Sequence, residues 1–146
     1  MSKILHHAIK SAVIFSSVFF ATSIFAAPQD WQQIKRPIPA ENGKAEAIGS
    51  YSNGCIIGAE PLPYKGEGYQ VIRMNKNRYY GHPDMIRYLQ RLGQRVKAAG
   101  LPTMLVGDIA MPGGGRFLTG HASHQMGLDA DIWLRMGSMS DTDALN

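Results

Sequence analysis

The chain has 146 residues, a formal net charge of +4 and a single cysteine. This length suits one ordinary domain rather than two large ones. Charged residues make up 18% of the chain and are nearly balanced in sign, which excludes a disordered charged tail and a dedicated nucleic-acid binder. We therefore expect a folded domain with no nucleic-acid partner.

The first 26 residues are typical of an export signal. Lys3 and Lys10 supply positive charge, and the segment 11–25 is apolar and ends before small residues and Pro28. This apolar stretch is about 15 residues long, short of the roughly 20 that a membrane-spanning helix needs. We therefore predict a cleavable signal peptide over residues 1–26, a mature domain over residues 27–146, and no stable membrane span after cleavage.

The mature sequence indicates a mixed α+β domain with more strands than helices. An extended arm is expected over residues 27–49, with Trp31 and Ile34 as its anchors. One helix is predicted from Pro83 to Gly100, where apolar residues recur every three to four positions. Four segments are apolar and partly β-branched and are therefore predicted as strands, namely residues 55–58, 69–74, 103–109 and 132–134.

The single cysteine, Cys55, lies where a turn signal leads into an apolar segment. Exported chains fold in oxidising compartments, where cysteines are usually paired. Two interpretations stay open. Cys55 is either a buried, inert thiol or one half of a disulfide whose partner lies beyond the end of this sequence.

Most of the candidate functional side chains lie in residues 111–132. This segment contains a glycine-rich loop, two histidines and two aspartates. His121 and His124 are three residues apart, and Asp129 and Asp131 follow just before an apolar strand. Polar groups of this kind are unfavourable beside a core unless they have a role. Imidazole and carboxylate ligands together suit zinc, which in catalytic sites usually has three protein ligands and one open position.

The pattern alone leaves the ligand set open. In a strand that begins near Asp129, the side chains of Asp129 and Asp131 lie on the same side, so either can bind metal while the other orients an imidazole. Both His121 and His124 can bind, or only one of them can, with a third ligand absent from this sequence.

Two other kinds of site are disfavoured in the same segment. A phosphate-binding loop at residues 113–116 lacks the Lys-Ser/Thr ending of a P-loop. A catalytic triad of Ser123, His124 and Asp129 would crowd its three members into seven residues, which seldom allows triad geometry. A metal site therefore remains the favoured hypothesis.

Residues 120–132, Gly-His-Ala-Ser-His-Gln-Met-Gly-Leu-Asp-Ala-Asp-Ile, resemble the first zinc motif of the penicillin-insensitive murein endopeptidases. These peptidases share a zinc superfamily with lysostaphin-type peptidases, D-alanyl-D-alanine carboxypeptidases and hedgehog domains. The resemblance implies that His124 and Asp131 bind zinc. It covers essentially the whole mature chain, with further matches at residues 49–55, 78–83 and 107–112.

The resemblance implies a periplasmic zinc endopeptidase that hydrolyses peptide cross-links of peptidoglycan, including D-alanyl–diaminopimelate bonds. Its partners would be peptidoglycan stem peptides, and metal-activated water would replace an acylated serine, so that penicillin has nothing to trap. The expected fold is α+β, mainly an antiparallel sheet with flanking helices and the zinc site at the sheet. His121, Asp129 and Arg116 are candidates for substrate contact or for orienting the ligands.

One departure from the family is large. The family also carries a downstream His-x-His motif, with the third zinc ligand and the catalytic base, and a later cysteine that pairs with the one matching Cys55. Neither is present before this sequence ends at Asn146. We therefore expect an N-terminal fragment with an incomplete fold, no catalytic base, weak zinc binding and no activity. The alternatives are a carboxypeptidase or dipeptidase of the same superfamily and a non-catalytic murein-binding module.

Overall fold

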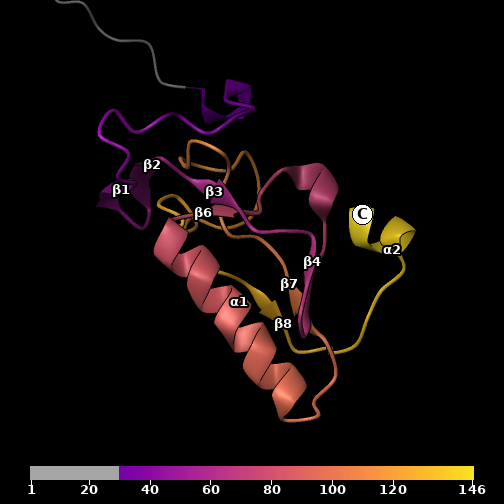
Figure 1. Ribbon diagram of the computed structural model, residues 1–146. Helices are drawn as coiled ribbons and strands as arrows, with labels where there is room; N and C mark the ends of the chain where they lie inside the picture. The colour runs from indigo at the N-terminus through magenta and orange to yellow at the C-terminus, as the bar shows by residue number, and fades with distance from the viewer. Residues whose placement is uncertain (1–29) are drawn as a thin grey trace, which may run out of the picture.

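The computed structural model describes residues 30–146 and is drawn in Figure 1. The signal peptide predicted at residues 1–26 lies outside the described residues. All strand pairs in the described chain are antiparallel except one, and a single long helix accompanies them. The predicted α+β class with a mainly antiparallel arrangement is therefore confirmed. No helix in this part of the chain is long and apolar enough to cross a membrane.

The central sheet has four strands in the order β4–β5–β7–β8. β5 and β7 run parallel, and the two outer pairs are antiparallel. A parallel pair needs a crossover connection, which here contains the helix α1 (Pro83–Ala98). The four strands are β4 (Lys65–Gly66), β5 (Tyr69–Val71), β7 (Met104–Val106) and β8 (Ile132–Trp133).

The helix α1 (Pro83–Ala98) lies across this sheet in Figure 1. Pro83 occupies its first position, and the His82 side chain caps it by accepting a hydrogen bond from the Asp84 N–H. Beyond its end, Gly100 has a left-handed backbone with φ 67°. The main core joins buried side chains of the helix, the sheet and nearby loops: Leu62, Tyr69, Val71, Ile86, Leu89, Met104, Val106 and Ile109.

Two small antiparallel sheets and three short helices complete the described fold. The strand β6 (Tyr80–Gly81) pairs with β3 (Glu60–Pro61), and its Tyr80 N–H donates to the Ala110 carbonyl, which brings the start of α1 close to the segment after β7. The small sheets pair β1 (Glu46–Ser50) with β2 (Asn53–Ile57), and β3 (Glu60–Pro61) with β6 (Tyr80–Gly81). The short helices are η1 (Trp31–Gln33), η2 (Met74–Lys76) and α2 (Asp141–Leu145).

Several predicted strands differ in extent from those observed. The strand expected at residues 69–74 ends at Val71, because Arg73 takes a left-handed backbone with φ 58° just before η2. The strand expected at residues 103–109 is confined to β7. β1 lies in the segment that the sequence assigns to the extended arm.

Asp129 and Asp131 do not lie in a strand. β8 begins at Ile132, so the prediction that a strand starts near Asp129 and places both carboxylates on one side is wrong. The three residues before β8 are not assigned to a strand, so strand alternation does not fix the directions of their side chains.

The arm before β1 is anchored on the glycine-rich loop. A Cβ placed on Gly115 would lie 2.0 Å from ring atoms of Trp31, and one on Gly113 would lie 3.0 Å from the Ile34 side chain. Contacts this close confirm the prediction that Trp31 and Ile34 are anchors. Within the same arm, the Gln32 side chain donates a hydrogen bond of 3.1 Å to a carbonyl of the loop.

Candidate metal centre

The predicted metal ligands lie in one cluster after the glycine-rich loop. His121, His124 and Asp131 each offer one ligand atom, and these atoms all lie within 4.8 Å of one another. The side chain of His124 is 3% exposed, whereas those of His121 and Asp131 are 44% and 33% exposed. One buried and two accessible groups leave the cluster open toward solvent, as a catalytic metal centre requires.

Two separations within this cluster, each to a different oxygen of Asp131, are close to those between the ligands of a tetrahedral zinc ion. His124 Nε2 lies 3.3 Å from Asp131 Oδ1, and His121 Nε2 lies 3.4 Å from Asp131 Oδ2. Ligands at about 2.0–2.1 Å around a tetrahedral ion are roughly 3.3 to 3.4 Å from one another. Two imidazoles and a carboxylate are also a donor set that zinc accepts. The described residues therefore fit zinc.

Asp129 approaches the second nitrogen of the same imidazole. Its Oδ2 atom lies 2.9 Å from His124 Nδ1, but the pair lacks hydrogen-bond geometry, and Nδ1 is a buried atom without a hydrogen-bond partner in the described chain. Metal-binding histidines usually donate their second N–H to a carboxylate or carbonyl. A modest rotation of the half-exposed Asp129 carboxylate would supply that acceptor.

A strained backbone and a buried amide fix the position of His124. Its φ of 66° is in the left-handed region, which is uncommon for a residue with a side chain. The side chain of the next residue, Gln125, is buried and donates to the carbonyls of Ser52 (2.9 Å) and Ala122 (2.8 Å). The side-chain oxygen Oε1 of Gln125 accepts a hydrogen bond of 3.1 Å from the Gly54 N–H. These bonds tie the strained segment to the β1–β2 hairpin.

Asp131 is positioned by the sheet rather than by the loop. Its N–H donates to the Asp108 carbonyl and its own carbonyl accepts from the Gly107 N–H, both at 2.9 Å. These two backbone hydrogen bonds lie next to the antiparallel pair of β7 and β8. The carboxylate and the two imidazoles therefore approach the same point from separately supported segments.

Comparisons with known proteins show the family to which this chain belongs. A family model described as penicillin-insensitive murein endopeptidase matches residues 47–146. The chain belongs to this family. The predicted family membership is confirmed, and the matched residues include the whole cluster of His121, His124, Asp129 and Asp131.

Relatives with the same name are similar along most of the chain. A penicillin-insensitive murein endopeptidase of Haemophilus influenzae is 75% identical over 146 residues, which are 100% of this chain and 50% of that protein. Proteins so named from Escherichia coli O157:H7 and Shigella dysenteriae serotype 1 are 50% identical over 124 residues, covering 85% of this chain and 44% of theirs. The chain thus spans about half the length of the curated relatives that it matches.

Two further residues singled out from the sequence lie outside the cluster. Arg116 has an exposed side chain, and its carbonyl accepts the hydrogen bond from Gln32 in the arm. Cys55 lies partly buried in β2 as a free thiol, since the sequence contains a single cysteine. Burial raises the pKa of the Cys55 thiol above its ordinary value, which disfavours the reactive thiolate.

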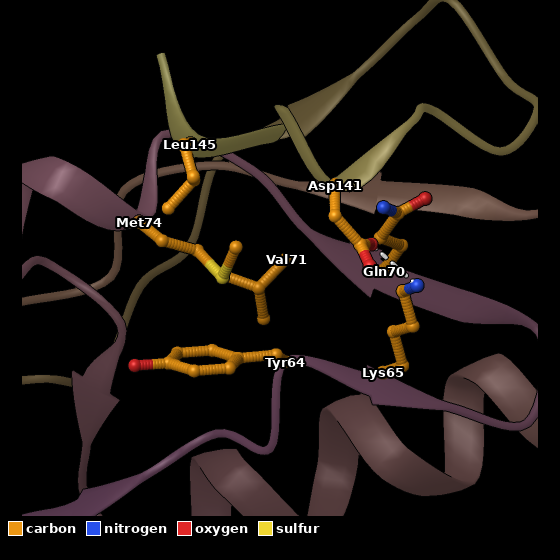
Figure 2. A pocket seen from close by; sticks show the side chains of 7 residues that line it. All are labelled: Tyr64, Lys65, Gln70, Val71, Met74, Asp141 and Leu145. Carbon is orange, nitrogen blue, oxygen red and sulfur yellow. Dashed lines mark ion pairs between the residues drawn. The ribbon is translucent and has the colours of Figure 1, made fainter. Parts of the chain in front are cut away.

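A cavity of ≈ 340 Å³ is separate from the metal ligands. Figure 2 shows it with the Tyr64 ring facing the side chains of Val71 and Met74. At one side, Lys65 of β4 and Asp141 of α2 form an ion pair. Its lining residues include no member of the His/Asp cluster, so this cavity is not part of the candidate metal centre.

Sequence reasoning misses the side chains that support the cluster. Asp108 carries the one signal that was available, because a carboxylate inside a buried apolar segment needs a partner. Arg78 pairs with Asp108 and lies over the ring of Phe117. Arg78 and Phe117 come from segments far apart in the sequence, so local spacing does not reveal their contact. Gln125 carries no signal either, because its three hydrogen-bond partners become neighbours only in the folded chain.

Proposed function

We propose that this chain supplies residues of a zinc centre that hydrolyses peptide cross-links of peptidoglycan, including D-alanyl–diaminopimelate bonds. The observation that carries the proposal is the 3.3 Å separation between Nε2 of the buried His124 and Oδ1 of Asp131. Membership of the murein endopeptidase family supports the substrate class, since the relatives are named for action on murein.

Each residue of the cluster has a separate proposed role. His124 and Asp131 hold the zinc ion, and Asp129 accepts the second N–H of the His124 ring and so orients it. His121, which is more exposed, faces the stem peptide beside the ion, and Arg116 is available on the same loop for carboxylates of that peptide. When bound, zinc supplies Lewis acidity and an activated water near neutral pH.

The proposed place of action is the periplasm, and the proposed partners are peptidoglycan stem peptides. The composition of residues 1–26, which is basic at the start and then apolar, supports export. Peptidoglycan lies on the outer side of the cytoplasmic membrane, so an exported chain meets this substrate directly.

The zinc part of the proposal is tested by calorimetric titration of the chain with Zn²⁺. We expect one zinc per chain, with weak affinity, and loss of that binding in His124→Ala. The matched control is His82→Asn, which changes a histidine outside the cluster and keeps a side-chain acceptor at the start of α1. Equal zinc affinity in His124→Ala and in the unchanged chain would refute the ligand assignment.

The hydrolytic part is tested on purified cross-linked muropeptide dimers. The chain is assayed alone and joined to the half of the Haemophilus influenzae relative that it does not match. We expect the joined protein to release monomers, and a chelator or His124→Ala to stop the release. We expect none from the chain alone, because its sequence has no His-x-His motif.

The same assay separates the alternatives. A carboxypeptidase or dipeptidase would release terminal D-alanine from free pentapeptide and leave the dimers intact. A binding module would co-sediment with murein sacculi after zinc removal and release nothing even when joined. Either result would replace the endopeptidase proposal.

A further inference from the structure

A buried ion pair between Arg78 and Asp108 lies next to the candidate metal centre, because the Asp108 carbonyl accepts the N–H of Asp131. Asp108 is 1% exposed, and its Oδ2 atom accepts a 2.9 Å hydrogen bond from Nη1 of Arg78. Arg73 contributes a weaker contact of 3.4 Å to the same oxygen. A buried carboxylate without such partners would be strongly unfavourable, so Arg78 has a fixed place in the fold.

The same guanidinium also lies on an aromatic ring that reaches the metal ligand. The Arg78 Cζ atom is 3.9 Å from the centroid of the Phe117 ring. Phe117 is buried, and its ring is stacked with that of His124 at a centroid distance of 5.9 Å and an interplanar angle of 14°. Arg78, through Phe117, therefore limits the tilt of the His124 imidazole.

Arg78 is connected to both of the segments that carry the proposed zinc ligands. Its Nη2 donates to the Thr119 carbonyl at 3.4 Å, between the stacked Phe117 and the two histidines in the sequence. Its partner Asp108 accepts, through the backbone carbonyl, the N–H of Asp131. One side chain thus joins the loop that presents His124 to the strand end that presents Asp131.

We propose that Arg78 is a positioning residue that sets the relative placement of His124 and Asp131 and thereby the zinc affinity of the centre. This inference rests on the proposed function for the identity of the metal. A guanidinium is required, because it pairs with Asp108 and lies over the Phe117 ring at the same time. A lysine ammonium keeps the charge but lacks the extended, delocalised group that makes both contacts.

The test compares Arg78→Lys with Arg73→Lys in the full chain. Both changes remove a guanidinium bonded to Asp108, and of the two it is Arg78 that stacks on Phe117. We expect Arg78→Lys to raise the zinc Kd by about tenfold or more, the range seen when outer partners of metal ligands are changed. For Arg73→Lys we expect less than a twofold change.

Two further readouts separate positioning from general stability. The visible spectrum with Co²⁺ in place of zinc reports ligand geometry, and we expect it to change in Arg78→Lys and not in Arg73→Lys. In the metal-free chain, the NMR shifts of the His124 ring protons report its stacking on Phe117, and we expect the same contrast. A change confined to the melting temperature would overturn the positioning role.

A second variant keeps the proposal testable if Arg78→Lys does not fold. Phe117→Leu leaves the Arg78–Asp108 pair in place and removes the ring between Arg78 and His124, so we expect a similar loss of zinc affinity. Unchanged affinity in Phe117→Leu would overturn the proposal. Failure of the unchanged chain to bind zinc would refute the proposed function instead, and the metal-free NMR comparison would still decide the role of Arg78.

Discussion

Two aspartates approach the His124 imidazole from its two nitrogens, and this arrangement separates their roles. Asp131 lies on the Nε2 side, where its second oxygen also reaches His121. Asp129 lies on the Nδ1 side, near a nitrogen that has no hydrogen-bond partner in the described chain. The proposed ligands, His124 Nε2 and Asp131, therefore lie on one side of the ring, and Asp129 lies at the opposite ring nitrogen.

Replacing each aspartate by asparagine tests this division. We expect Asp131→Asn to raise the zinc Kd by at least a hundredfold, because it removes the charge of a direct ligand. We expect Asp129→Asn to raise it about tenfold, as is usual for a partner of a ligating histidine. Calorimetric titration of both variants measures the difference, with their unfolding midpoints as a check on folding. Losses of equal size would show that Asp129 also binds the metal.

At the scale of elements, the packing of α1 on the β4–β5 hairpin depends on close backbone approach. A Cβ on Gly93, inside the helix, would lie 2.5 Å from the Glu67 carbonyl oxygen and 2.8 Å from Cδ1 of Tyr69. Gly68 has φ 71°, and a Cβ placed on it would lie only 2.0 Å from the Gly93 carbonyl oxygen. The backbones therefore meet where a side chain has no room, and this contact places the sheet that carries β7 and β8.

Gly93→Ala tests that contact. Alanine favours an isolated helix over glycine by up to about 1 kcal/mol, but overpacking against a fixed backbone oxygen costs about 1–3 kcal/mol. We therefore expect a net loss of about 1 kcal/mol or more in the free energy of unfolding, measured in urea. Gln94→Ala, at an exposed position next to it, should stay within about 0.5 kcal/mol of the unchanged chain. Equal or greater stability of Gly93→Ala would contradict the close packing.

The elements that the sequence predicts are those with a local signal. The helix has apolar residues at three-to-four spacing, a proline at its start and Gly100 after its end, and all of these act within the helix itself. β1 lacks such a signal, because all of its residues are exposed and its pairing with β2 supplies the order. β5 ends early because Arg73 takes a left-handed backbone, and its contact with Asp108 is one that sequence spacing does not reveal.

In the candidate site, too, the sequence predicts the features that have a local signal. The residue types and spacing of His121, His124, Asp129 and Asp131 predicted a metal site, and the folded chain brings ligand atoms of His121, His124 and Asp131 within 4.8 Å. The reason given for the carboxylates, alternation along a strand, was wrong, since backbone bonds to Gly107 and Asp108 direct Asp131 instead. Cross-chain support of this kind depends on tertiary packing, which a local pattern does not encode.

At the scale of the whole molecule, a segment distant in sequence supports the loop that carries the site. The arm before β1 lies at the same end of the molecule as the loops after β7 in Figure 1. Trp31 packs on Gly115, Ile34 packs on Gly113, and the Gln32 side chain bonds to the Arg116 carbonyl. The loop is thus held by the arm on one side and by Gln125 on the other.

Trp31→Ala tests whether the arm stabilises this loop. Because Trp31 is partly buried, we expect a loss below the 3–5 kcal/mol of a fully buried tryptophan, about 1–3 kcal/mol in the free energy of unfolding. Hydrogen exchange should become faster at the N–H of Gly115, which donates to the Gln125 carbonyl, and zinc affinity should fall because Gln125 is the neighbour of His124. Gln33→Ala, at an exposed position in η1, is the matched control and should change none of these measurements. Native exchange at Gly115 in Trp31→Ala would mean that the loop keeps its shape without the arm.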